Sequence, residues 1–109
     1  MGDVARWKAQ YGSDSVFVTS LTPSYHVVWR TLARTEYREL VGALQDSLAR
    51  GVSQAEANLD NEERIAARCI LFPPVTVASL ASELAGLPSL IAQEVMEASG
   101  FNSHEVRQL

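Results

Sequence analysis

Cysteine, histidine and clustered glycine are all scarce in this sequence of 109 residues, and each scarcity excludes a class of site. Cys69 is the single cysteine, so the chain has no internal disulfide, which fits a reducing compartment. A reactive thiolate needs an open, electropositive setting, whereas Cys69 has apolar neighbours, and we interpret it as a buried structural residue. His26 and His104 are too few and too far apart for a zinc site. We expect no metal and no cofactor, because the isolated glycines form no phosphate-binding loop either.

Basic residues and long apolar runs are also scarce. Lys and Arg number 9 against 13 Asp and Glu, which gives a net charge of −4. A nucleic-acid interface needs a concentrated basic face, so we expect no nucleic-acid partner and instead a preference for basic partners. No apolar run is long enough to span a membrane, and Met1–Val4 does not begin a signal peptide. These absences predict a cytoplasmic protein without a membrane partner.

Candidate catalytic residues are few. Asp60–Glu63 forms a local acidic patch, but it lacks the glycine and the ligand alternation of a calcium loop. The patch has two interpretations: a solvated helix face, or a docking surface for a basic partner. General acid–base chemistry needs a cleft that shifts a carboxyl pKa, and an exposed helix face offers none. We therefore expect no enzymatic activity; a small hydrolase or a nucleic-acid binder is the minor alternative.

The N-terminal third is typical of a β-hairpin. Residues 1–14 form a separate segment, and residues 15–101 form one predicted domain, since hydrophobic residues make up 47% of the chain. Within 16–32, two runs rich in β-branched and aromatic residues flank the turn Thr22–Pro23–Ser24. No third strand is expected, so helices must cover the hairpin and one edge stays unpaired. This deficit predicts association through the hairpin edge, with a partner or with a second copy.

The remainder is predicted to be helical. Apolar spacing, a capping box at Ser53–Glu56 and the breakers that follow each run predict helices at about 35–50, 53–72, 77–85 and 87–99. Pro88 suits the first turn of the last helix, and Gly100 is predicted to be its left-handed cap, with Phe101 folding back near Met96. Residues 102–109 are predicted to be a flexible tail. The expected fold class is α+β, mostly helical, with a hairpin packed on three to four short helices.

An ordered set of motifs carries a family resemblance. The motifs are Trp7–Lys8, Tyr11–Gly12, Trp29–Arg30–Thr31–Leu32 with Arg34, Glu36 and Tyr37, Glu63–Arg64–Ile65, Cys69–Ile70–Leu71–Phe72–Pro73, Gly86–Leu87–Pro88–Ser89–Leu90–Ile91 and Ser99–Gly100–Phe101. This series spans about residues 7–101 and resembles small tail assembly chaperone-like proteins of tailed bacteriophages, especially those with contractile tails. The resemblance implies a non-enzymatic protein of the host cytoplasm that binds tape-measure protein or tail subunits until the tail tube polymerises.

A structural role is the alternative implication. The chain would then be a small adaptor of the tail, baseplate or neck, and it would stay in the virion. Either role needs an open strand edge or an apolar groove that shields a partner. The candidate partner-binding residues are Trp29, Arg30, Arg34, Tyr37, Asp60, Glu63, Leu87, Leu90 and Ile91. For the stripe of Leu87, Leu90 and Ile91, ordinary core is the competing interpretation.

Overall fold

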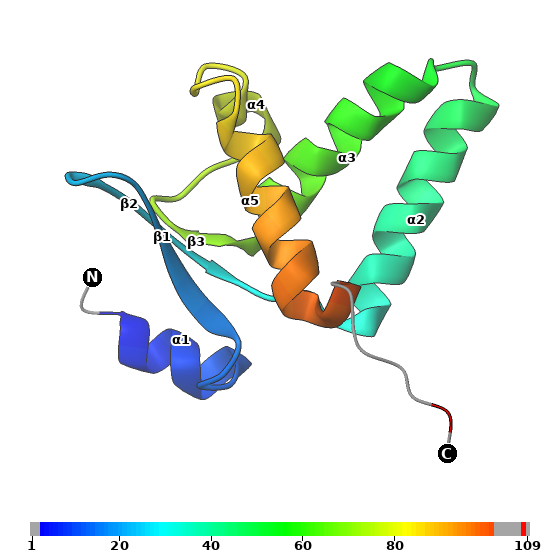
Figure 1. Cartoon of the computed structure of the whole chain (residues 1–109). Coiled ribbons are helices and arrows are strands. Elements are labelled where there is room, and N and C mark those ends of the chain that lie inside the picture. Colours follow the sequence, from blue (N-terminus) through cyan, green and yellow to red (C-terminus); the bar gives the residue numbers. More distant parts are fainter. Residues whose placement is uncertain (1–2, 102–107, 109) are drawn as a thin grey trace.

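The computed structural model describes residues 3–101 and residue 108, so the tail predicted at 102–109, with His104, lies almost entirely outside the described residues. The fold is α+β and mostly helical, and the hairpin packs on helices, as the sequence predicted (Figure 1). The elements in chain order are α1 (Val4–Tyr11), β1 (Val16–Thr22), β2 (Tyr25–Arg30), α2 (Arg34–Ala49), α3 (Gln54–Cys69), β3 (Ile70–Phe72), α4 (Val77–Leu80) and α5 (Leu87–Met96), followed by a wider π-turn (Glu97–Phe101).

The sheet has three antiparallel strands in the order β1-β2-β3. The prediction of no third strand is therefore wrong, and the second predicted helix ends at Cys69 instead of continuing to residue 72. Two local causes favour this ending: Ile70 is β-branched, and Pro73 disfavours a helical conformation at Phe72. The free side of β2 supplies the third cause, because it pairs Val28 with Phe72 and Trp29 with Ile70.

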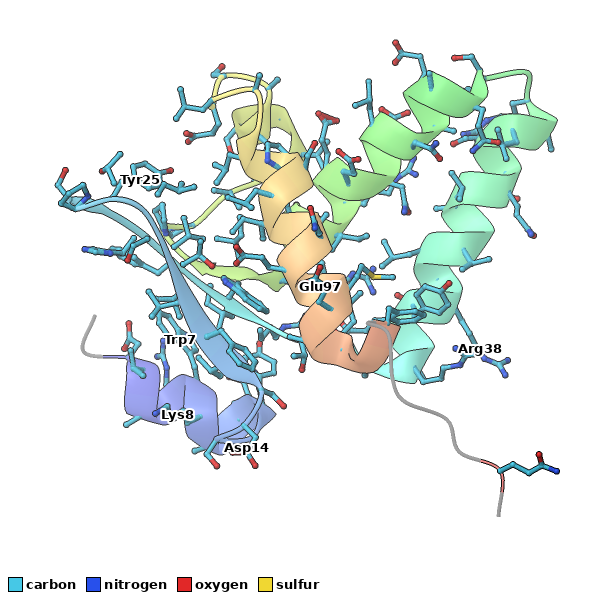
Figure 2. All side chains as sticks on the ribbon, viewed as in Figure 1. Trp7, Lys8, Asp14, Tyr25, Arg38 and Glu97 are labelled. Atoms are coloured by element: carbon cyan, nitrogen blue, oxygen red, sulfur yellow. The ribbon has the colours of Figure 1, made fainter. Side chains whose placement is uncertain are left out.

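Because β2 is the central strand, both of its faces are covered. Val27 and Trp29 face the core on the side of α3 and α5, and Val28 is buried on the opposite face. Helix α1 covers that second face: its Trp7 is buried and lies between α1 and the strands (Figure 2). The main core joins buried side chains of the sheet to those of the helices, namely Val27, Trp29, Leu40, Ile65, Ala66, Cys69, Ile70, Leu80, Leu87, Ile91, Ala92 and Val95.

The last third differs in detail from its prediction. The helix predicted at 77–85 ends at Leu80, and the chain continues through tight turns in which Ser82 and Glu83 donate to carbonyls three residues earlier. Pro88 lies in the first turn of α5, as predicted. The helix predicted at 87–99 keeps regular geometry only to Met96, and Gly100, inside the π-turn that follows, has a φ of 102°. No helix among the described residues is long and apolar enough to cross a membrane.

Candidate functional site

A groove opens between α2 and α5. Helix α3 packs along both of its neighbours, whereas α2 and α5 diverge, so that α3 forms the floor between them (Figure 1). Two adjoining hollows of about 110 Å³ and 330 Å³ share Asn61, Ile65 and Met96. A third hollow, of about 140 Å³, shares Tyr37 with the smaller of these and continues towards Phe101. We call this connected surface the α2–α5 groove.

The walls of the groove are mainly apolar. From α2 come Tyr37, Leu40, Val41 and Leu44, and from the C-terminal half of α5 comes Met96. Tyr37, Val41, Leu44 and Met96 are half-buried, so they retain surface that a partner could cover. Helix α3 contacts both α2 and α5, and the space above it between these two helices is open.

Asn61 places one polar atom on the floor of the groove. Its Oδ1 is buried and has no hydrogen-bond partner among the described residues. A buried carbonyl oxygen without a donor costs about 1–3 kcal/mol relative to a satisfied one. The Oδ1 atom has almost no accessible surface, so a partner's donor could reach it only if the Asn61 side chain turned towards the groove.

Charged residues lie at the ends of the groove. At one end the guanidinium of Arg34 lies over the ring of Tyr37, at 5.4 Å from its centroid, and Tyr37 in turn packs against Phe101 at 4.7 Å between ring centroids. Phe101 therefore lies against Tyr37 of α2. At the other end Glu62 accepts a hydrogen bond from Ser89. Arg38 points away from the groove into solvent (Figure 2).

The predicted partner-binding residues separate into two groups. Arg34 and Tyr37 lie together at one end of the groove. Asp60 and Glu63 are half-buried on α3, and Leu90 is exposed on α5. By contrast Trp29, Leu87 and Ile91 belong to the core, so for the stripe on α5 the competing interpretation of ordinary core holds at Leu87 and Ile91.

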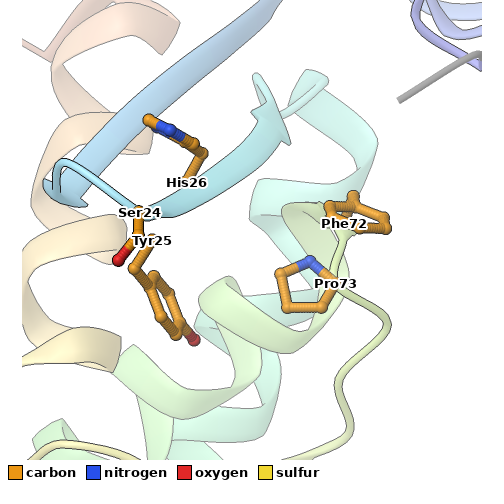
Figure 3. A pocket seen from close by; sticks show the side chains of 5 residues that line it. All are labelled: Ser24, Tyr25, His26, Phe72 and Pro73. Carbon is orange, nitrogen blue, oxygen red and sulfur yellow. The ribbon is translucent and has the colours of Figure 1, made fainter.

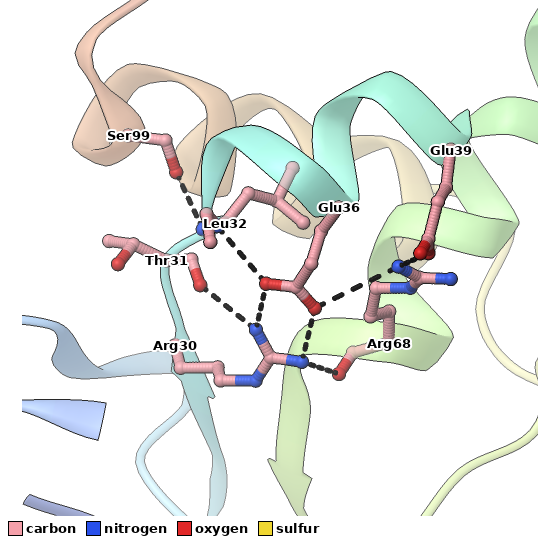
Figure 4. Close-up of polar contacts among 8 residues, drawn as sticks. Arg30, Thr31, Leu32, Glu36, Glu39, Arg68 and Ser99 are labelled. Carbon is pink, nitrogen blue, oxygen red and sulfur yellow. Dashed lines mark hydrogen bonds and ion pairs between the residues drawn. The ribbon is translucent and has the colours of Figure 1, made fainter. Parts of the chain in front are cut away.

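Arg30 lies inside a network of charges that fastens α2 to the sheet and to α3. Its two terminal nitrogens donate to the two carboxylate oxygens of Glu36 at 2.8 and 2.9 Å, and one of them also donates to the carbonyl of Arg68 (Figure 4). Arg68 pairs with Glu39 at 2.5 Å. Donation to Glu36 from Arg30 is the main reason that the pKa of this carboxyl is lowered. Arg30 is thus committed to the fold and offers little to a partner.

Val41, Leu44, Asn61 and Met96 are groove residues that the sequence interpretation missed. A signal for Asn61 was available, because it lies four residues after Ala57 and four before Ile65, and both of these are buried on α3. A polar side chain at that spacing occupies a position that should be apolar. Val41 and Leu44 fit the apolar stripe of α2 and therefore could not be told from core residues.

A separate hollow, of about 250 Å³, lies away from the α2–α5 groove, at the tip of the hairpin beside Phe72 and Pro73. Tyr25 and His26 project to opposite faces of β2, so their polar groups do not converge (Figure 3). His26 Nδ1 is 2.7 Å from the hydroxyl of Ser20, and Tyr25 donates to Glu83 at 3.4 Å. Burial and then Glu83 raise the pKa of Tyr25. The Ser20 hydroxyl and the His26 imidazole thus form an exposed side-chain pair across the hairpin, and among the described residues neither has a further side-chain hydrogen-bond partner.

Cys69 is fully buried, as its neighbours predicted, and burial raises the pKa of its thiol to about 12. Among the described residues no group of three His, Cys, Asp or Glu side chains is placed to hold a metal ion. Comparison with known proteins identified no matching family model, no matching curated protein and no matching solved structure.

Proposed function

We propose that this chain is a non-enzymatic assembly chaperone for a phage tail, and that it holds a helical segment of its client in the α2–α5 groove. The observation that carries the proposal is the open space between α2 and α5, with half-buried apolar walls above the floor of α3. An amphipathic helix laid into this space would cover Val41, Leu44 and Met96 and complete a four-helix arrangement. The resemblance to tail assembly chaperones supports tape-measure protein or a tail subunit as the client.

The floor of the groove restricts the client further. The backbone N–H groups inside a helix are already bonded to its own carbonyls, so only a side chain of the client could donate to Asn61 Oδ1, once the amide of Asn61 turns towards the groove. The expected segment therefore has an apolar stripe interrupted by one donor side chain, such as Ser, Thr, Gln or Lys. A purely apolar helix would leave the Asn61 oxygen buried and unsatisfied, and it would bind more weakly.

Binding of purified client tests this proposal. The tape-measure protein and the tail tube subunit from the same phage genome are titrated separately against the chain by isothermal calorimetry. Val41→Lys places a charge on the groove wall and should weaken binding about 10-fold or more. Leu59→Lys is the matched control, because Leu59 is 52% exposed on α3 and lines none of the three hollows, so its affinity should be unchanged.

Two outcomes would contradict the proposal. Equal affinity of the Val41→Lys and wild-type chains would place the client outside the groove. Stoichiometric copies of the chain in purified mature virions would contradict a chaperone role and favour the structural adaptor of the tail, baseplate or neck.

A further inference from the structure

Strand β1 presents an open edge to solvent. In the antiparallel ladder with β2, Ser15 accepts from the N–H of Thr31 at 3.0 Å, and the register pairs Phe17 with Trp29 and Thr19 with Val27. Hydrogen-bonded pairs alternate with non-bonded pairs, so the odd-numbered residues of β1 bond to β2. The N–H and C=O groups of Val16, Val18 and Ser20 consequently point away from the sheet.

These outward-facing groups have no hydrogen-bond partner within residues 3–101. The side chains beside them are exposed and apolar: Val18 is 57% exposed and Phe17 is 39% exposed. The opposite side of the sheet differs, because β3 covers the second edge of β2. The free hairpin edge predicted from the sequence lies on β1, and the three-residue strand β3 forms the other edge of the sheet.

β1 also lacks the usual protection of an edge strand. Natural edges are blocked by Lys, by Pro, by inward-pointing charges or by bulges. The sequence Val-Phe-Val-Thr-Ser-Leu-Thr contains no charge and no proline, and its irregularity comes only between Ser20 and Thr22. Residues 16–20 therefore form a regular, uncharged pairing surface.

We propose that two copies of this chain pair through their β1 edges, antiparallel about a two-fold axis at Val18, to form one continuous six-stranded sheet. A two-fold dimer needs a surface that is complementary to itself. In this register Val18 faces Val18 of the other copy, and Val16 faces Ser20, so all three outward-facing residues are paired. A shift by two residues in either direction leaves one of them unpaired or reaches the irregularity at Thr22.

Side-chain chemistry favours a second copy as the occupant of this edge. On the α1 face, Val16 and Val18 of both copies would meet beside a hollow of about 270 Å³ that Val4, Lys8 and Val28 also line. On the other face Phe17 would lie opposite Thr19, whose hydroxyl is already bonded to Trp29 at 2.8 Å and to Glu94. Only its methyl group is then available to the Phe17 ring, and none of the residues 16–20 that pair across the axis carries a charge.

The oligomeric state and its concentration dependence test the dimer. A strand-edge interface is smaller than a standard interface, so the dimer should be concentration-dependent, and sedimentation from about 1 µM to 1 mM should show the mass rising from 11.9 kDa to twice that value. The Val18→Lys variant should remain monomeric at every concentration in this range. Val77→Lys is the matched control, since Val77 is 46% exposed on α4, and it should dimerise like the wild type.

Cysteine crosslinking tests the register. Val18→Cys places two thiols opposite each other at a Cα separation of about 5.5 Å, within the range of a disulfide, and should crosslink on mild oxidation. Ser20→Cys is equally exposed but faces Val16 of the other copy, so it should not crosslink. Cys69 is buried and should give no background.

Several results would overturn the dimer. These are a single-chain mass for the wild type at every concentration, a dimer that survives Val18→Lys, or crosslinking of Ser20→Cys as readily as of Val18→Cys. A wild-type monomer whose client binding is lost in Val18→Lys would instead make the edge a site for an extended segment of the client. Calorimetry of Val41→Lys concerns a different surface, so failure of the groove and failure of the dimer are distinguishable.

Discussion

Arg30 and Glu36 form a two-point ion pair that joins the end of β2 to the first turn of α2. The same carboxylate accepts a hydrogen bond from the N–H of Ala33 at 3.0 Å, so one side chain both caps α2 and holds the strand (Figure 4). Glu36 is only 22% exposed, which limits screening by solvent. This pair fixes the direction in which α2 leaves the sheet, and the α2–α5 groove depends on that direction.

Glu36→Gln should lower the free energy of unfolding by about 2 kcal/mol, because it leaves the half-buried guanidinium of Arg30 without a counter-charge. Urea denaturation followed by circular dichroism measures the loss. The matched control is Glu39→Gln, whose carboxylate pairs with Arg68 but is 64% exposed. The control should lose less than about 1 kcal/mol. Equal losses in the two variants would contradict a special role for Glu36.

The free energy of unfolding, measured as the pH is lowered, should reveal the contribution of the same ion pair. The pKa of Glu36 in the folded chain lies below its ordinary value of 4.5, so the ionised carboxylate stabilises the fold. That contribution is fully present above about pH 4.5 and is lost as the pH falls through the lowered pKa. The difference in stability between wild type and Glu36→Gln should therefore shrink as the pH is lowered from 7 to 3. A constant difference would show that ionisation of Glu36 contributes nothing.

Substitution by alanine should change the free energy of unfolding in opposite directions at two glycines. Gly100 has φ of 102°, where a Cβ is strained, so Gly100→Ala should destabilise the chain by about 1 kcal/mol. Gly42 lies inside α2, and a Cβ there would meet nothing within 4 Å, so Gly42→Ala should stabilise by about 0.5–1 kcal/mol. Thermal unfolding of both variants measures the two changes in stability. Stabilisation by Gly100→Ala would contradict the left-handed conformation of Gly100, and destabilisation by Gly42→Ala would contradict the open space at Gly42.

Cys69 should be inert in the folded chain. With a thiol pKa of about 12, only about one molecule in ten thousand carries the thiolate at pH 8, and the sulfur is buried as well. 5,5′-Dithiobis(2-nitrobenzoate) should release no thionitrobenzoate from the native protein over an hour. In guanidinium chloride it should release one equivalent per chain. Rapid reaction in native buffer would show that α3 opens readily near its C-terminal end.

Asn61→Leu should separate stability from binding. Leucine has a similar volume and removes the unsatisfied oxygen, so the free energy of unfolding should rise by about 1 kcal/mol while affinity for the client falls. Asn58→Leu is the control: Asn58 is exposed one turn earlier on α3 and accepts from Gln54 at 2.8 Å, so its affinity should not change. A stability gain without loss of binding would mean that the client donates nothing to Asn61.

The local signals in the sequence were sufficient for most elements. The β-branched and aromatic runs around Pro23 located the hairpin, apolar spacing located α2 and α3, and Pro88 and Gly100 marked the start and the end of the last helical segment. Each of these features depends on residues close in sequence, where turn chemistry and periodicity act. The burial of Cys69 followed from its apolar neighbours for the same reason.

Tertiary structure decided the rest. From the sequence alone, Ile70–Phe72 is predicted to be the end of a helix. These residues form a strand because they pair with β2, and only the fold brings the two segments together. The groove likewise depends on the angle between α2 and α5, which the contact of Arg30 with Glu36 helps to set across the strand–helix junction. Periodicity marked apolar side chains in both helices, but which of them are core, as Ile91 is, and which line an open surface, as Val41 does, depends on how the helices pack.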